Sequence, residues 1–179
     1  MKNITCAFLL IAILLVGSCN LINKLGQFYV DYNEHVTFVP ALPANIPFTV
    51  YSPPITTNIE QTLKSNNTNP QLVKSVQLNR LTFTVTSPSG QTFSFLQNVS
   101  VYISTDSLPE VEIASKQSIP DTIGAQLNLD INNVDLKNYL ESNQFKLRIT
   151  CTSNQMLSQS VDVNIYTKFF VQANLLAAL

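Results

Sequence analysis

The chain has 179 residues, the length of one domain of ordinary size with a short additional segment. Charged residues make up only 12% of it, and 10 Lys and Arg are balanced by 11 Asp and Glu. Binding to a phosphate backbone requires clustered basic residues, so this balance argues against a nucleic-acid-binding protein. The 4 glycines are spread along the chain, which excludes a glycine-rich phosphate-binding loop.

The N-terminal segment has the order of an export signal. Lys2 precedes the apolar run Cys6–Val16, and the small residues Gly17 and Ser18 follow. This run is about half of the roughly 20 residues that a membrane-spanning helix needs. We therefore expect residues 1–18 to be a signal peptide and not a transmembrane anchor.

The four residues Val16-Gly-Ser-Cys19 resemble the lipobox of bacterial lipoproteins. This resemblance implies that Cys19 is diacylated, becomes the new N-terminus and ties the protein to a membrane through a tether, residues 19–27. Asn20 stands where the family uses Asp for retention in the inner membrane, so the resemblance implies the outer membrane. We expect its periplasmic face. Ordinary secretion, with cleavage near the same position, is the alternative.

Residues 28–173 alternate between apolar and polar side chains over several short stretches, which predicts a single antiparallel β-sandwich, immunoglobulin-like or jelly-roll. One short helix is expected near residues 135–141, where Asp135 can cap it, and residues 174–179 form an apolar tail. The positions predicted to face the core include Leu81, Phe83, Val85, Val99, Val101, Ile103, Leu127, Leu129, Phe145, Leu147, Ile149, Val161, Val163, Ile165, Phe169 and Val171.

A hairpin is predicted around Pro88-Ser89-Gly90. A three-residue loop there would place Val85 opposite Phe93 and Phe83 opposite Phe95, with Gly90 in the left-handed conformation that such loops require. Upstream, closely spaced prolines between Pro40 and Pro54 indicate a sheet edge or a crossing between sheets. Ile55–Leu63 is expected to be a strand followed by an exposed loop.

Two residue types with catalytic potential occur as isolated examples. His35 is the only histidine, and a zinc site needs three or four nitrogen or sulfur ligands, so we interpret it as a surface residue. Cys151 is in phase with apolar strand residues. Cys6 leaves with the signal and Cys19 carries lipid, so Cys151 is expected to be a buried, unpaired and inert thiol. Serines are plentiful, but no G-x-S-x-G motif accompanies them.

The segment from Asp130 to Glu141 partly matches a calcium-binding loop. Asp130, Asn132 and Glu141 fit positions one, three and twelve, but Val134 and Asp135 stand where an oxygen ligand and a glycine are required. We therefore interpret the segment as a strand end, a turn and a helix start, and we expect no metal and no cofactor.

Glu110 and Glu112 share one face of a predicted strand and could in principle form an acid/base pair. Alternation with Val111 and Ile113 indicates that both carboxylates face water, where they protect a strand edge from aggregation. The apolar tail Leu175–Leu179 is expected to fold back as a short cap or to touch a membrane or a partner.

The body of the chain is similar to a group of small uncharacterised lipoproteins of Gram-negative bacteria. The matching stretches are Leu81-Thr-Phe-Thr-Val-Thr, Phe93-Ser-Phe-Leu, Val99-Ser-Val-Tyr-Ile-Ser and Val134-Asp-Leu-Lys-Asn-Tyr-Leu before Phe145-Lys-Leu-Arg. The resemblance implies a β-sandwich at the outer membrane and brings no activity, catalytic residue or cofactor.

Three classes of function follow from these features. We expect a non-enzymatic, lipid-anchored module of the cell envelope that binds a protein partner or gives structural support. A carrier of an apolar ligand is the alternative and would need a cavity between the sheets. A hydrolase is the third, and it rests only on scattered serines and carboxylates.

Overall fold

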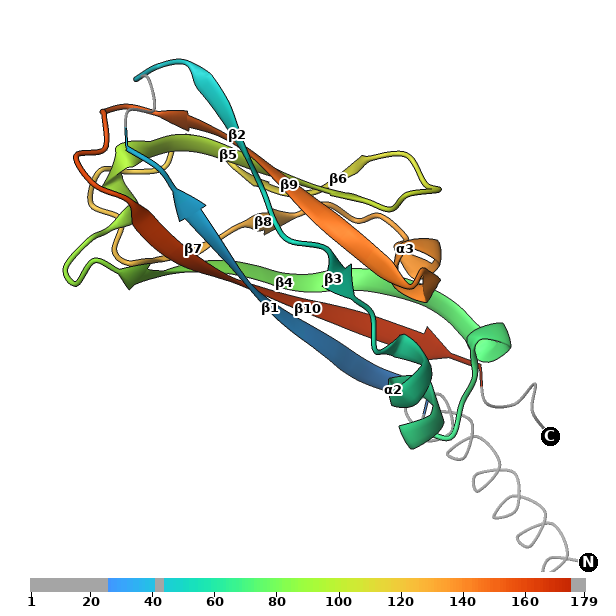
Figure 1. Cartoon of the computed structure of the whole chain (residues 1–179). Helices are drawn as coiled ribbons and strands as arrows, with labels where there is room; N and C mark the ends of the chain where they lie inside the picture. Colours follow the sequence, from blue (N-terminus) through green and yellow to red (C-terminus); the bar gives the residue numbers. More distant parts are fainter. Residues whose placement is uncertain (1–25, 41–43, 175–179) are drawn as a thin grey trace, which may run out of the picture.

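The computed structural model describes residues 26–40 and 44–174 (Figure 1). The predicted signal peptide, Cys19 and the tail Leu175–Leu179 lie outside these ranges. The elements are β1 Gln27–Phe38, β2 Pro47–Tyr51, β3 Ile55–Thr56, α2 Ile59–Ser65, η1 Pro70–Leu72, β4 Val73–Ser87, η2 Phe93–Phe95, β5 Leu96–Ser104, β6 Val111–Lys116, β7 Gln126–Asn128, β8 Asp130–Ile131, α3 Lys137–Glu141, β9 Gln144–Ser153 and β10 Val161–Ala173.

The strands form two sheets packed face to face, which confirms the predicted antiparallel β-sandwich. One sheet has the order β1-β10-β4-β7, and the other has the order β2-β9-β5-β6-β8, with β3 also paired to β9. Figure 1 shows the two sheets one above the other, with α2 beyond the end where β1 begins. Among the described helices, none is long and apolar enough to cross a membrane.

β10 is one of the two inner strands of the four-stranded sheet. It pairs antiparallel with β1 on one side and with β4 on the other, each time over most of its length. Its 13 residues alternate strictly between buried and partly buried positions, as the sequence predicted. The odd-numbered residues therefore face the core, and the even-numbered residues form an outward row.

Phenylalanines fill much of the space between the sheets. Six of them are fully buried, and most contact another aromatic ring with centroids about 6 Å apart, in the tilted or edge-to-face geometry that aromatic pairs prefer. The fully buried phenylalanines are Phe38, Phe83, Phe93, Phe95, Phe145 and Phe169.

The predicted hairpin around Pro88–Gly90 is wrong. β4 ends at Ser87 in one sheet and β5 begins at Leu96 in the other, so the chain crosses the sandwich between them. The short helix η2 lies in this crossing. Gly90 does have the predicted left-handed backbone, with φ of 80°. The sequence therefore indicates the turn correctly, but it does not show that the strand after the turn pairs in the opposite sheet.

A β-bulge in β4 reverses which of its residues face the core. Leu78 and Arg80 pair with successive residues of β10, which leaves Asn79 as the extra residue. Val76 and Leu78 point inward before the bulge, and Leu81 and Phe83 point inward after it. The bulge therefore turns Thr82 and Thr84 toward the outer face.

The strand expected over Ile55–Leu63 is also wrong in its larger part. Only Ile55–Thr56 is a strand, and helix α2 follows. Ile59 and Leu63, four residues apart, lie on one face of this helix and are both buried. Their spacing fits a helix as well as a strand, and packing against the end of the sandwich decides in favour of the helix.

The predicted short helix exists as α3, but Asp135 is not its capping residue. The N-cap is Leu136, and Asp135 stands one position earlier. Its carboxylate Oδ1 accepts hydrogen bonds from the backbone N–H of Lys137 at 3.1 Å and from that of Val76 in β4 at 3.0 Å. Asp135 thus joins the start of α3 to β4. Leu136 and Leu140 are fully buried, and Tyr139 packs against the core, as predicted.

We predict that Phe83→Ala lowers the free energy of unfolding by about 3–5 kcal/mol, because it removes buried apolar surface and leaves a cavity. Thr84→Ala, the neighbouring outward-facing change, should stay within about 0.5 kcal/mol of the wild type. Urea unfolding of both variants measures the difference. Equal losses at the two positions would contradict the inward and outward assignment.

Candidate functional site

The structure leaves His35 on the surface. Its side chain is exposed on the outer face of β1, and its register partner on β10 is Asn164. Cys151 lies in the core at 1% exposure, and burial raises the pKa of its thiol far above the usual value. The thiolate, which is the reactive form of cysteine, is therefore disfavoured, as the sequence predicted.

The three residues that fit positions of a calcium-binding loop contact different neighbours. The Asp130 carboxylate pairs with Lys116 at 3.1 Å. The Asn132 amide donates to the Glu112 carboxylate at 3.0 Å. Glu141 lies in α3, where burial raises the pKa of its carboxyl group and Lys137 partly opposes that effect. In residues 26–40 and 44–174 no group of three His, Cys, Asp or Glu is arranged to hold a metal ion.

Glu110 and Glu112 do not form a pair. Arg148 of β9 donates to both carboxylate oxygens of Glu110, with Nε 2.6 Å from Oε2, and its guanidinium lies 4.2 Å from the ring centre of Tyr102. The hydrogen bonds from Arg148 hold the pKa of Glu110 below its usual value of 4.5. The Glu112 carboxylate accepts a hydrogen bond from Asn132. Both carboxylates are therefore engaged by other residues and do not pair with each other.

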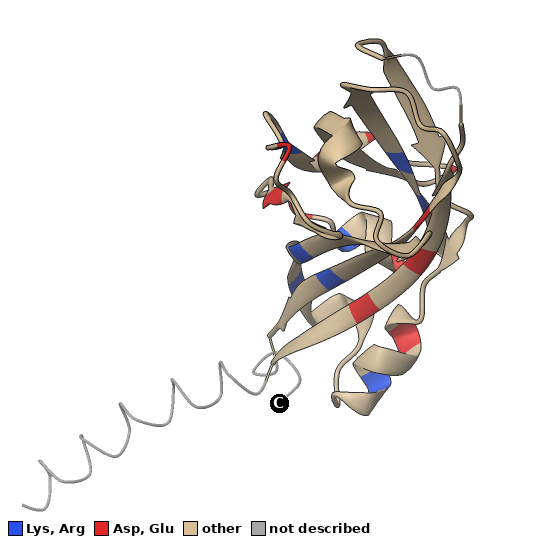
Figure 2. Ribbon diagram, turned by 90° about the vertical axis from the view of Figure 1, so that its left-hand side faces the viewer, with Lys and Arg blue, Asp and Glu red and all other residues tan. Residues whose placement is uncertain are grey.

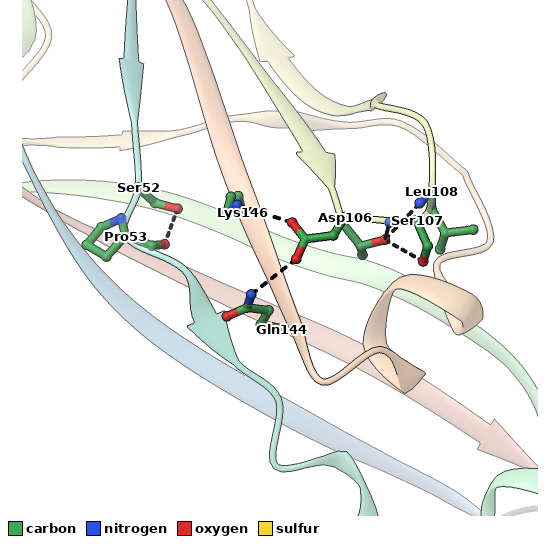
Figure 3. Close-up of polar contacts among 8 residues, drawn as sticks. Ser52, Pro53, Asp106, Ser107, Leu108, Gln144 and Lys146 are labelled. Atoms are coloured by element: carbon green, nitrogen blue, oxygen red, sulfur yellow. Dashed lines mark hydrogen bonds and ion pairs between the residues drawn. The ribbon is translucent and has the colours of Figure 1, made fainter.

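A second polar cluster lies at the end of β5 (Figure 3). Asp106 accepts hydrogen bonds from Lys146 at 3.3 Å and from Gln144 at 3.4 Å. The Lys146 hydrogen bond and charge, with a smaller effect of Gln144, lower the pKa of Asp106. The Asp106 side chain is largely solvent-exposed, so the cluster fixes a loop rather than building an enclosed site. Figure 2 shows both signs of charge distributed over the two sheets.

The outer face of the four-stranded sheet contains a hollow of about 560 Å³, which we call the polar groove. Its walls come from β1, β10, β4 and the segment from β7 to β8. Arg80 is the one charged residue of its lining, and most of the other lining side chains carry an amide or a hydroxyl. Its polar side chains include Asn33, Thr82, Gln126, Asn128, Asn164 and Tyr166.

Strand register aligns these side chains in rows across the sheet. Asn33 is the partner of Tyr166, Tyr166 is the partner of Thr82, and Thr82 is the partner of Asn128. This row therefore crosses all four strands. A parallel row, two residues along each strand, contains His35, Asn164, Thr84 and Gln126.

Hydrogen bonds within the groove leave part of each amide free. The Thr82 hydroxyl donates to Asn128 Oδ1 at 2.7 Å, and the Asn164 amide donates to Asn33 Oδ1 at 3.3 Å. Within the described residues, Nδ2 of Asn33 and of Asn128 and Oδ1 of Asn164 have no hydrogen-bond partner. The groove therefore presents two donors and an acceptor whose directions are fixed by their neighbours.

Tyr166 lies in the middle of the groove and is half-buried. Burial raises the pKa of its phenol, and a hydrogen bond with Asp31 and the charge of that carboxylate raise it further, against a smaller effect of Arg80. The Tyr166 phenol is therefore protonated at neutral pH, and its oxygen can accept a hydrogen bond while Asp31 holds its proton. The sequence alone does not reveal this hollow, because within each strand pattern its residues form only the polar half.

No family model matches the chain, and no curated protein matches it. Among solved structures, the chain is similar to a domain titled CpGH89CBM32-5 from Clostridium perfringens in complex with GalNAc-β-1,3-galactose, at 8% identity, with 80% of this chain and 97% of that chain covered and a TM-score of 0.37. It is also similar to the protein titled FLHE, at 11% identity, 83% and 99% coverage and a TM-score of 0.35. These distant likenesses concern the fold.

We predict that neither millimolar calcium nor a chelator changes the melting temperature of the protein. A ligand that binds only the native state raises the melting temperature, because it stabilises that state by RT ln(1 + [L]/Kd). Differential scanning calorimetry measures the shift. A clear rise with calcium that Asp130→Ala removes would overturn the structural interpretation of that turn.

Glu110→Gln should lower the free energy of unfolding at pH 7 by at most about 1 kcal/mol, since the ion pair with Arg148 is partly exposed and screened. The lowered pKa of Glu110 means that its contribution is complete above pH 4.5 and is lost as the pH falls through the folded-state pKa. Urea unfolding from pH 7 downward should show wild type and variant converging. In an Arg148→Met background the substitution should have no effect at pH 7, and a persistent effect would rule out the pair as its cause.

Proposed function

We propose that the protein is a non-catalytic binding module of the bacterial cell envelope, held at the outer membrane by lipid on Cys19. The lipobox-like order of residues 16–19 supports the anchor, and the packed sandwich supports a rigid body that presents a surface to a partner. The expected partner is another component of the envelope.

One observation on the fold carries this proposal. The first and last described strands meet at the same end of the sandwich, where the Ala173 N–H donates to the Gly26 carbonyl at 2.7 Å. The start of β1 and the end of β10 therefore lie side by side, beside α2 (Figure 1). An anchored N-terminus and an apolar tail would both act at this one end, and the opposite end of the sandwich would be free.

The arrangement of charged groups supports a role without catalysis. An acid/base or nucleophilic site brings titratable groups together in a hollow and shifts their pKa values. The carboxylates of Asp106, Glu110 and Asp130 are each engaged by a separate basic residue at the surface. His35 and Cys151 lie on different sheets, one exposed and the other buried.

The apolar-carrier alternative gains no support from the interior. A carrier needs an apolar cavity of several hundred Å³ between the sheets. Six fully buried phenylalanines pack there, and the large hollow at the outer face is lined mainly by amides and hydroxyls. The binding module is therefore the better-supported function.

Cys19→Ser should abolish incorporation of labelled palmitate and leave an unprocessed precursor, because the thiol is the acceptor of the first acyl chain in the proposed anchor. The matched control is Cys6→Ala, which keeps Cys19 and should be labelled and processed as the wild type. Metabolic labelling followed by electrophoresis and membrane fractionation measures both. Equal labelling of Cys19→Ser and the wild type would disprove the anchor.

A further inference from the structure

We infer that the polar groove on the outer face of β1, β10, β4 and β7 binds an uncharged glycan. This inference goes beyond the proposed function and does not depend on the lipid anchor. It rests on the chemistry of the groove, on its shape and on the contrast between the two outer faces of the sandwich.

The free amide groups suit a ligand rich in hydroxyls. A sugar hydroxyl both donates and accepts, and neighbouring hydroxyls are matched by side chains that offer both functions from fixed positions. Asn33 and Asn128 each have one free N–H₂ group, and Asn164 has a free carbonyl oxygen. The other atom of each amide is already hydrogen-bonded. Asn128 Oδ1 accepts from the Thr82 hydroxyl, and the Asn164 amide donates to Asn33 Oδ1, and these bonds hold the amides in place. Such preorganised amides lose little freedom when a ligand binds.

Tyr166 adds a partly exposed ring between the asparagines. A tyrosine ring offers an apolar face for the C–H surface of a pyranose and a hydroxyl at its edge. Further along β10, Phe170 packs against Tyr29 with ring centroids 5.4 Å apart, and Tyr29 is 48% exposed. Phe170 is four residues from Tyr166, about 13 Å along the strand. Lys168 lies between Tyr166 and Phe170 on the same face, and its ammonium group is 4.3 Å from the Tyr29 ring centre, so Tyr166 is the aromatic contact that the groove itself offers.

The groove does not fit the other common ligands of a sheet face. A nucleic acid requires several basic contacts, and Arg80 is the one charged residue in the lining. An added peptide strand needs a free sheet edge, whereas here the face of the sheet is hollowed and the backbones of β10 and β4 are already paired on both sides. The volume of the groove, about 560 Å³, lies within the range of about 300–1,000 Å³ that is typical of small-ligand sites.

The other outer face serves as an internal comparison. On β9, the outward side chains of Gln144 and Lys146 bind Asp106, and Arg148 binds Glu110 and Thr150. These polar groups satisfy one another, so little hydrogen-bonding capacity is left for a ligand. Both faces are polar, as an antiparallel sandwich requires, but the groove combines a hollow with free, oriented amides, whereas the polar side chains of β9 are paired with one another.

The test is binding of the purified full chain, in a zwitterionic detergent without a sugar headgroup, to an array that holds uncharged oligosaccharides, among them chitotetraose and cellotetraose, beside sulfated and carboxylated ones. The oligosaccharide with the strongest signal is then titrated by calorimetry. We expect Asn33→Ala and Tyr166→Phe each to weaken binding about tenfold, the loss of one oriented hydrogen bond. Melting temperatures of the variants verify that they fold.

The matched controls are Ser100→Ala and Tyr102→Phe on the outer face of the six-stranded sheet, which should change affinity by less than about twofold. Absence of binding to every uncharged glycan would overturn the inference. So would binding that survives both groove substitutions, or binding confined to sulfated or carboxylated glycans and lost at high salt. Because none of these results depends on Cys19, failure here and failure of the lipid anchor can be told apart.

Discussion

The pairing of β10 with strands on both of its sides is the constraint on which the rest of the structure depends. Its alternation runs without a break from Val161 to Ala173, so a slip of one residue would expose the whole apolar row. The same register places Asn164, Tyr166 and Lys168 outward, opposite side chains of β1 and β4. Burial of the apolar row fixes the register of β10, and the same register brings the groove residues together on the opposite face of the sheet.

Much of the fold could be predicted from the sequence, and the errors have physical causes. Strict alternation identified β9 and β10, because burial on one face requires it. Pro88-Ser89-Gly90 correctly indicated a turn, but local chemistry does not determine whether the next strand returns to the same sheet or joins the opposite one. Ile59 and Leu63 satisfy the helical period, and the β-rich context led to the wrong choice for that segment.

The groove is harder to predict than the core. The core requires only that each strand turn its apolar side inward, which one strand reveals by itself. The groove requires the register between strands: Asn33 and Asn164 are 131 residues apart in sequence, and Thr82 meets Asn128 only because β4 pairs with β7. A single sequence contains the polar residues of every strand but does not show which of them meet. The clusters that the sequence did suggest, at Glu110 and at Asp130, are engaged in separate ion pairs.

The two proposals together set how far the groove would stand from a membrane. Asn33 is six residues along β1 from Gln27, about 20 Å at the rise of an extended strand. An extended tether from Asn20 to Gln27 adds at most roughly 25 Å. A glycan in the groove would then lie within roughly 45 Å of the lipid surface, along a sheet face whose strands run away from the anchored end. Such a position would restrict the protein to glycans close to the membrane, and lengthening the tether would extend that reach without altering the groove.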